Sequence, residues 1–256
     1  RNPGRRQILI PVSIVIVTKD EELHIEGALA SARDAAEIIV IDSFSTDRTV
    51  DICKKYTDKI FQKEWQGYAK QKQLAVDAAA GPWVLILDAD ERLTPELKSE
   101  ITNAIAKNKH NGFYMPRKNF FAGKWIRHGG WWPDHTLRLF KKEAGYVEER
   151  EVHEKVIVKG SVSYLKNPLE HYTYNSISDY IKRMDTYSAL AAKELKKTGK
   201  VPNPLNLIVR PPAAFIKMFF VRLGFMDGMH GLILAVLYSY YTFLKYAKTR
   251  EVTPVD

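Results

Sequence analysis

Several features are scarce or missing in this sequence of 256 residues, and each absence narrows the function. Cys53 is the single cysteine, so no intramolecular disulfide can form and the fold does not depend on an oxidising compartment. Neither the G-x-G-x-x-G pattern of dinucleotide-binding folds nor the G-x-x-x-x-G-K-[ST] phosphate loop occurs. Zinc-ligand spacings and the signatures of nucleic-acid-binding modules are also missing. Nucleic acid is therefore a poorly supported partner, and phosphate groups would have to be bound by another device, such as a metal ion.

The composition is that of an ordinary globular protein. Hydrophobic residues make up 45% and charged residues 27%, which argues against a disordered chain. The length suffices for one large domain with an appendage. A formal net charge of +9 favours anionic partners, such as phosphorylated substrates or anionic lipid. A merely solvated basic surface is the alternative.

The first hundred residues alternate short apolar runs with helical patterns. The apolar runs are rich in β-branched residues, as in the buried strands of a parallel sheet, and we expect strands over 13–18, 38–41, 58–62 and 83–87. Helices are expected over 21–33, 48–56, 71–80 with Gly81 as C-terminal cap, and from the N-cap Thr94 and Pro95 to Lys107. This alternation predicts an α/β fold with a mostly parallel sheet flanked by helices.

The pattern changes after Gly112. Strand-like pieces at 113–117 and 136–140 lie among aromatic and basic residues, and a helix is expected over 178–197. Four prolines within 200–212 indicate a linker, and 213–248 is a strongly apolar helical region. We therefore expect a catalytic domain over residues 1–199 and a C-terminal helical region over 200–256.

Acidic residues follow three of the expected strands. They occur at 20–22, at Asp42 and in Asp88-Ala-Asp90. Because ligands of such sheets bind beyond the carboxyl ends of the strands, the three segments predict one site. Mg²⁺ or Mn²⁺, held by one or two carboxylates and substrate phosphates, would neutralise a diphosphate leaving group. A D-x-D pair is short and also occurs by chance, so a solvated turn with a helix-capping acid is the alternative.

These segments resemble the N-terminal motifs of family 2 glycosyltransferases, which have the GT-A fold. The resemblance is carried by Val17-Thr-Lys-Asp-Glu-Glu22, Ile41-Asp-Ser-Phe-Ser-Thr-Asp-Arg-Thr49 and Val84-Leu-Ile-Leu-Asp-Ala-Asp-Glu91, and covers roughly residues 12–110. Later pieces are similar to the branch of lipopolysaccharide-core β-1,4-glucosyltransferases; they are Gly130-Trp-Trp-Pro-Asp134, Leu137-Arg-Leu-Phe140, Arg150-Glu-Val-His-Glu154 and Gly224-Phe-Met-Asp-Gly228. The resemblance implies an inverting transferase that uses a nucleotide-sugar donor.

The resemblance also implies roles for donor-binding residues. Thr18 and Glu21 would line the nucleoside pocket, and Asp42 would accept a hydrogen bond from the uracil imide. Lys72 would face the nucleotide, Asp88 with Ala89 the ribose and phosphate, and Asp90 the metal ion. Asp20 and Gln73 stand where the family usually has Asn, so contacts of these two positions differ from the family pattern.

An inverting transfer needs a general base for the acceptor hydroxyl. The resemblance assigns this role to Glu154, with Glu149, Glu151 and Asp134 as competing candidates. His153 could bind the diphosphate and His171 the metal ion, although a lone histidine is more often structural. Arg138 could clamp a phosphate bidentately, with a surface salt bridge as the alternative. Trp131 and Trp132 could stack on sugar faces or pack in a core.

The C-terminal region points to a membrane surface. Residues 228–244 carry no formally charged side chain, but 17 residues are fewer than the roughly 20 that span a bilayer. Tyrosines and phenylalanines enrich the stretch, and Lys245, Lys248 and Arg250 follow it. We expect helices that lie in the membrane interface, although a hairpin packed on the catalytic domain or a dimer interface would show the same pattern. Pro11 and Ser13 interrupt the first apolar run, which is unlike a secretory signal, so a cytoplasmic location is expected.

Together these features predict a hexosyltransferase that is peripheral on the inner face of the cytoplasmic membrane. It would move a hexose, glucose by resemblance, from a UDP-sugar to a membrane glycolipid or lipopolysaccharide-core saccharide. Two alternatives stay open at this point, namely a polyprenyl-phosphate sugar synthase and a non-catalytic membrane adaptor that retains a nucleotide-sugar fold. The adaptor is the less favoured of these because Asp42, Asp88, Asp90 and Glu154 are all present.

Overall fold

The computed structural model describes residues 10–148, 155–197 and 203–251, which form two compact units. The first unit runs to Arg117 and resumes over His135–His171, and the second comprises Lys118–Asp134 and the chain from Tyr172 onward. The boundary expected between residues 199 and 200 falls outside the described residues and stays a prediction. Residues 118–134 and the helix that precedes this boundary belong to the same compact unit as the C-terminal helices.

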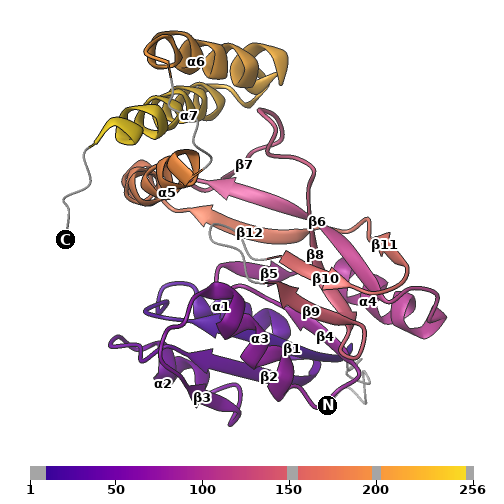
Figure 1. Cartoon of the computed structure of the whole chain (residues 1–256). Coiled ribbons are helices and arrows are strands. Elements are labelled where there is room, and N and C mark those ends of the chain that lie inside the picture. Colours follow the sequence, from indigo (N-terminus) through magenta and orange to yellow (C-terminus); the bar gives the residue numbers. More distant parts are fainter. Residues whose placement is uncertain (1–9, 149–154, 198–202, 252–256) are drawn as a thin grey trace. The chain divides into compact units, whose positions relative to one another are not determined.

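Three parallel strands form the centre of the first unit (Figure 1). β1 (Ile10–Thr18) pairs with β2 (Ala35–Asp42) on one side and with β4 (Trp83–Ile86) on the other. β3 (Ile60–Gln62) extends the sheet beyond β2, also in parallel. In this register Thr18 lies opposite Asp42, so the carboxyl ends of β1 and β2 meet at one edge. The four strands expected in this part of the chain are confirmed.

The rest of the sheet is mixed. β8 (Asp134–Lys141) is antiparallel to β4, and the sheet continues through β6 (Gly112–Phe121) and β12 (Leu169–Tyr174) to β5 (Glu91–Leu93). The remaining strands are short: β7 (Lys124–Trp125) and β11 (Val162–Tyr164) pair with β6, while β9 (Gly145–Glu148) and β10 (Lys155–Val158) form a separate ladder. The parallel part therefore coincides with the segment in which the sequence alternates strands and helices.

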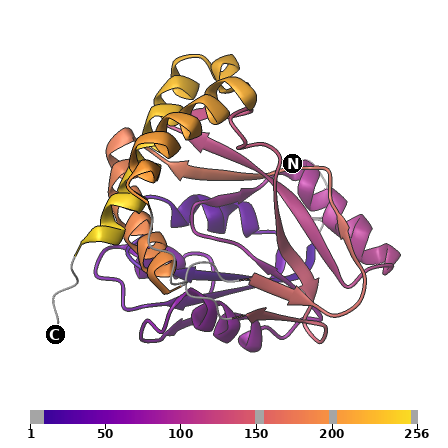
Figure 2. The same ribbon diagram turned by 45° about the horizontal axis from the view of Figure 1, so that its top comes forward.

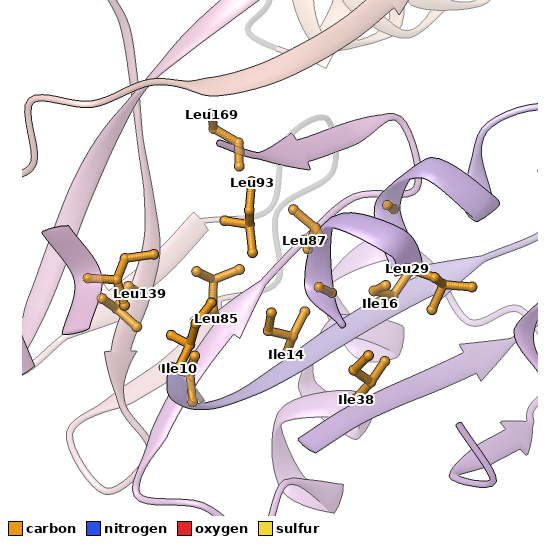
Figure 3. Close-up of a cluster of buried hydrophobic side chains, with 14 of the residues drawn as sticks. Ile10, Ile14, Ile16, Leu29, Ile38, Leu85, Leu87, Leu93, Leu139 and Leu169 are labelled. Atoms are coloured by element: carbon orange, nitrogen blue, oxygen red, sulfur yellow. The ribbon is translucent and has the colours of Figure 1, made fainter. Parts of the chain in front are cut away.

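Helices cover both faces of the parallel strands because both faces are apolar. Ile14 and Leu85 face one cluster, together with α1 (Ile25–Ala32), α2 (Thr49–Cys53) and α4 (Pro95–Lys107). The neighbouring Val15 and Val84 face a second cluster with α3 (Tyr68–Ala78). Figure 3 shows side chains of the first cluster converging between β1, β4 and α1. Cys53 is buried here, and burial raises the pKa of its thiol to about 12, so it is an inert core residue.

One helix end agrees with the expectation from the sequence, and another differs from it. The hydroxyl of Thr94 accepts a hydrogen bond from the backbone N–H of Leu97 at 3.2 Å, which confirms the expected N-cap of α4. The expectation that Gly81 caps α3 is wrong, because α3 ends at Ala78 and its cap is Ala79. Gly81 serves a close approach instead, since its N–H donates to Ser13 Oγ at 3.1 Å and a Cβ would lie 2.7 Å from that oxygen.

The second unit is built around helices. α5 (Ile177–Lys197), α6 (Leu205–Ile216) and α7 (Met229–Ala247) pack on a cluster that includes Phe121 and Leu234. Figures 1 and 2 show α6 and α7 side by side. Between them lie the π-helix η1 (Lys217–Val221) and the 3₁₀-helix η2 (Gly224–Asp227), and η3 (Lys248–Arg250) ends the described chain.

The expectation of a linker over 200–212 is wrong from Leu205 onward. α6 contains both Pro211 and Pro212, two of the four prolines from which the linker was predicted. Burial of one face against α7 holds this helix together, and the Ser239 hydroxyl of α7 donates to the carbonyl of Pro211 at 2.8 Å. Tertiary contacts thus override a local propensity. Within the described part of the chain, no helix has the length and apolarity that crossing a membrane requires.

Candidate active site

The ends of β1 and β2 form a dense hydrogen-bonded corner. Asp42, the last residue of β2, is completely buried. Its carboxylate accepts from the backbone N–H and hydroxyl of Ser45 and from Gln62 Nε2, the last at 3.1 Å. A carboxylate has about four acceptor positions, so one is left for a further donor. The imide contact that the resemblance assigns to Asp42 stays a prediction.

The acidic segment 20–22 is hydrogen-bonded to the turn that follows β2. Asp20, at φ +53°, accepts hydrogen bonds from the N–H and hydroxyl of Thr46 at 2.7 and 3.2 Å. The backbone N–H of Glu21 donates to Thr49 Oγ1 at 2.8 Å, and that of Glu22 to Asp47 Oδ2 at 3.0 Å. Asp20 and the Glu22 backbone therefore shape the corner around Asp42. The nucleoside-pocket role of Glu21 is untested.

Three buried polar atoms at this edge of the first unit have no hydrogen-bond partner within the described residues. They are Thr18 Oγ1 at the end of β1, Gln71 Oε1 on α3 and Arg138 Nε on β8. Native proteins satisfy the great majority of such atoms, so a group of orphans indicates a place where another molecule supplies the partner. The role of Thr18 stays a prediction, and Gln71, which the sequence did not single out, is a further candidate.

Asp88 lies between two cations. Lys72 Nζ, from α3, is 2.8 Å from Asp88 Oδ1, and the Arg138 guanidinium from β8 binds Asp88 Oδ2. Lys72 and Arg138 are buried, whereas Asp88 retains partial exposure. Two elements, α3 and β8, therefore converge on the acid that follows β4. The structure brings together Lys72, Asp88 and Arg138, which were all singled out from the sequence.

The cations set the protonation state of this carboxylate. Burial raises the pKa of Asp88, but the charges of Arg138 and Lys72, with a smaller effect of His171, hold that pKa well below its usual range. Burial lowers the pKa of Arg138, and Asp88 and Glu91 more than reverse this, so that its pKa lies above the usual range. Asp88 is an anion and Arg138 a cation at every physiological pH.

Glu91 completes the cluster and was not among the predicted site residues. It is fully buried, and its carboxylate binds Arg138 NH2 at 2.8 Å and the backbone N–H of Asp88 at 3.0 Å. Arg117 NH1, on β6, lies 3.8 Å from the same carboxylate. Arg138 is therefore held by two acids, and the phosphate clamp proposed for it from the sequence stays a prediction. The feature of the sequence that could have identified Glu91 is its charge directly after Asp90.

A second arginine stabilises the loop that follows β4. Arg92 donates to the carbonyls of Ala89 and Glu91, both at 2.8 Å, and to that of His24 at 2.6 Å. Gly27 of α1 leaves the space for it, because a Cβ there would lie 2.2 Å from Arg92 Nε. Ala89 is buried, and its carbonyl accepts a hydrogen bond from Arg92. A contact between Ala89 and the nucleotide-sugar stays a prediction.

Asp90 and His171 are the predicted metal ligands, and they face each other. His171 Nε2 lies 3.4 Å from Asp90 Oδ2, and both side chains are mostly buried. β12 and β5 pair next to them, with His171 opposite Glu91. Within the described residues, no three or more His, Cys, Asp and Glu side chains gather as a metal site. The two predicted ligands therefore lie next to each other, and their binding of a metal ion stays a prediction.

Asp134 belongs to the second unit. Asn119 Nδ2, itself buried, donates to Asp134 Oδ2 at 3.1 Å and to the carbonyl of Trp131 at 3.2 Å. Trp131 packs against Phe121, while Trp132 contacts Trp125 edge to face. The Trp-Trp-Pro-Asp segment is thus fixed by contacts inside its own unit. The predicted base Glu154, its competitors Glu149 and Glu151, and His153 lie outside the described residues.

Sequence comparison identifies relatives over nearly the whole chain. The chain is 30% identical to the "Lipopolysaccharide core biosynthesis glycosyltransferase LpsC" of Rhizobium meliloti (strain 1021), over 93% of this chain and 92% of that protein. An uncharacterized glycosyltransferase of Rickettsia bellii (strain RML369-C) is 31% identical, over 94% of this chain and 87% of that protein. Both relatives align across the two compact units.

Structural and family comparisons agree with these relatives. The mannosyltransferase PcManGT of Pyrobaculum calidifontis, solved with GDP-Man and Mn²⁺, matches with a TM-score of 0.53 at 15% identity, covering 93% of this chain and 86% of that one. At this identity the match shows the fold alone, and it confirms the expected GT-A architecture. The profile of the family described as "Glycosyl transferase family 2" matches residues 13–172, which carry Asp42, Asp88 and Asp90. The chain is an enzyme that belongs to glycosyl transferase family 2.

Proposed function

We propose that this glycosyltransferase is an inverting, metal-dependent enzyme that moves a hexose, glucose in this proposal, from a UDP-sugar to a saccharide of the lipopolysaccharide core or a related membrane glycolipid. The observation that carries the proposal is the cluster of Lys72, Asp88 and Arg138 beside the Asp90–His171 pair, at the edge where β1 and β4 end. Parallel sheets bind their ligands at this edge.

The donor half of the proposal rests on unsatisfied and charged groups. Among the described residues, Thr18 Oγ1 and Gln71 Oε1 have no hydrogen-bond partner, as is expected of groups that bind a nucleoside. Asp42 keeps one acceptor position for an imide N–H. Lys72 and Arg138 fix Asp88 as an anion that is able to accept from ribose hydroxyls. Uridine is favoured by the resemblance, and its imide N–H suits a carboxylate acceptor.

The metal-binding part of the proposal rests on the chemistry of the two candidate ligands. One carboxylate from Asp90 and the imidazole of His171 fit a site in which the diphosphate supplies the remaining ligands. Asp88 is unsuited to this role as it stands, because both of its oxygens bind cations. When bound, Mg²⁺ or Mn²⁺ would neutralise the charge of the leaving diphosphate. Asp90 and His171 would hold it.

The proposed transfer step rests on the resemblance to inverting glycosyltransferases. The acceptor oxygen forms a bond to the anomeric carbon while the bond from that carbon to the diphosphate breaks, and UDP leaves. The hydroxyl proton goes to a general base, for which we propose Glu154. Asp134 remains the alternative, and its hydrogen bond from Asn119 would hold it as an acceptor.

The acceptor is proposed from the relatives and from the second unit. The Rhizobium relative is named for lipopolysaccharide core biosynthesis, and it aligns over both units of this chain. Lipid-linked acceptors are presented at a membrane, so we propose that the enzyme works as a peripheral protein on the inner face of the cytoplasmic membrane. The exposed apolar residues between α6 and α7 support this part of the proposal.

Calorimetric titration tests the donor class. UDP, UDP-glucose and GDP-mannose are each titrated into the full chain, with Mn²⁺ and with a chelator. GDP-mannose is the informative competitor because PcManGT was solved with it. Metal-dependent binding of both uridine ligands, with no binding of GDP-mannose, is the expected result. Binding of GDP-mannose alone would refute the UDP-sugar assignment.

A further inference from the structure

The segment that joins α6 to α7 in the second unit turns apolar side chains outward. Six large apolar residues, five of this segment and the first of α7, are 45–70% exposed: Phe220, Val221, Leu223, Phe225, Met226 and Met229. They fall within ten residues of chain, so the exposure is concentrated rather than scattered. We name these six residues the apolar tip. Contiguous exposed apolar groups on a folded protein mark an interaction surface.

The backbone of this segment explains why the tip faces outward. Gly231 at the start of α7 approaches η2 so closely that a Cβ there would lie 1.8 Å from the carbonyl oxygen of Gly224. The turn is closed by hydrogen bonds from Arg222 N–H to the Lys217 carbonyl and from Met226 N–H to the Leu223 carbonyl, both at 2.9 Å. Backbone packs against backbone at this point, while Met218 and Asp227 are the buried side chains of η1 and η2 beside the exposed ones.

The charges around the apolar tip have one sign. Between residues 203 and 230 the basic residues are Arg210, Lys217 and Arg222, and all three are exposed. The acid in the same stretch, Asp227, is only 3% exposed. Its carboxylate accepts from the backbone N–H groups of Arg127 and His128, the latter at 2.8 Å. The outward surface of this stretch is therefore apolar and cationic.

We propose that the apolar tip and its three basic neighbours dock the enzyme on an anionic lipid bilayer by shallow insertion. Interfacial segments combine apolar side chains that enter the acyl boundary with Lys and Arg that bind anionic headgroups. A second copy of this chain would present the same three positive charges and would be repelled, which argues for lipid as the occupant. This inference rests on the membrane attachment in the proposed function and assigns its surface and lipid chemistry.

The same segment holds the residues that precede Trp131 and Asp134. Lys124 Nζ donates to the carbonyl of Asp227, and the N–H of Gly129 donates to the carbonyl of Arg222, both at 2.8 Å. Docking of the tip would thus place the Trp-Trp-Pro-Asp segment next to the bilayer surface. A lipid-linked saccharide would meet that segment on leaving the headgroup layer.

Vesicle co-flotation tests the proposal with the full chain. The probes are phosphatidylcholine vesicles with and without phosphatidylglycerol, and the variants are Val221→Glu and Leu23→Glu. Both substitutions replace a strongly exposed apolar residue by the same acid, but Leu23 lies in the first unit. We expect binding to the anionic vesicles only, a loss of at least about fivefold in Val221→Glu and little change in Leu23→Glu.

Three results would overturn the assignment. They are wild-type protein that ignores anionic vesicles, equal losses in the two variants, and a dimer in sedimentation analysis that Val221→Glu dissociates. UDP binding is measured on the same samples by calorimetry. Val221→Glu is expected to bind UDP like the wild type, so a failed donor site and a failed docking surface give different results.

Discussion

Lys72 Nζ lies 2.8 Å from Asp88 Oδ1, which places a buried cation from α3 directly on the first acid after β4. Arg138 binds the other oxygen of the same carboxylate. Asp88 is therefore not a free metal ligand but an oriented anion with two positive neighbours. This contact supports the proposal that Asp88 faces the nucleotide-sugar and Asp90 the metal ion, since Asp90 is the acid that faces His171.

Replacing Lys72 by Met should weaken UDP binding by about tenfold, or about 1.4 kcal/mol. Methionine can fill the space of the buried aliphatic stem but leaves Asp88 with one cation. Calorimetry with UDP measures the effect. Lys70→Met, at an exposed position of the same helix, is the matched control and should bind UDP like the wild type. Unchanged affinity in a folded Lys72→Met variant would remove Lys72 from the donor site.

Gly27→Ala should destabilise the protein, although alanine in place of glycine inside a helix normally stabilises it by about 1 kcal/mol. The new methyl would displace Arg92, which holds the carbonyls of His24, Ala89 and Glu91. A loss of about 1–3 kcal/mol is expected from urea unfolding. A gain in stability would show that Arg92 does not need the space above Gly27.

Glu37 should make stability depend on acid pH. Burial raises its pKa, but hydrogen bonds from Lys59, Ser13 and the Ala80 N–H outweigh this, so the folded-state pKa lies below the ordinary value. Its contribution is complete above the unfolded pKa of about 4.5 and is lost as the pH falls through the folded value. Glu37→Gln should cost about 1–2 kcal/mol near pH 7 and progressively less below pH 5.

Urea unfolding at several pH values between about 7 and 3 checks this dependence. The exposed Glu143 provides the control, since Glu143→Gln should leave the pH profile of the wild type unchanged. Parallel profiles of the wild type and Glu37→Gln would contradict the prediction.

Glu154→Gln should abolish sugar transfer and leave UDP binding unchanged. The amide keeps the size of the side chain but cannot take the proton of the acceptor hydroxyl. Transfer from radiolabelled UDP-glucose and calorimetry with UDP separate the two effects. Glu149→Gln and Glu151→Gln are the controls and should retain transfer. Wild-type transfer in Glu154→Gln would move the base assignment to Asp134 or another acid.

Local patterns predicted the parts of the fold that local energetics decide. The apolar runs gave β1, β2 and β4, and the Thr94-Pro95 start gave α4, because strand burial and helix capping depend on adjacent residues. Pro211 and Pro212 misled the same reasoning. Their helix is held by its packing on α7, and no local pattern shows which partner will cover a face.

The candidate site was predictable to the extent that it lies at strand ends. Asp42 ends β2 and Asp88 and Asp90 follow β4, so topology alone brings them to one edge. The role of Glu91 depends on Arg138, 47 residues further along the chain, and only the folded structure brings the two together. Asp20 and Glu22 appeared to belong to the acidic site, yet Asp20 and the Glu22 backbone bind the 45–49 turn.

The most direct test of the central claim compares UDP-glucose binding of the wild type and Asp90→Asn by calorimetry, each with Mn²⁺ and with a chelator. The wild type is expected to bind only with Mn²⁺, and Asp90→Asn is expected to lose at least about tenfold of this affinity. Asn is nearly isosteric, so the fold should survive the change. Equal binding of UDP-glucose by both proteins, or binding by the wild type that ignores Mn²⁺, would contradict the assignment of Asp90 to the metal ion.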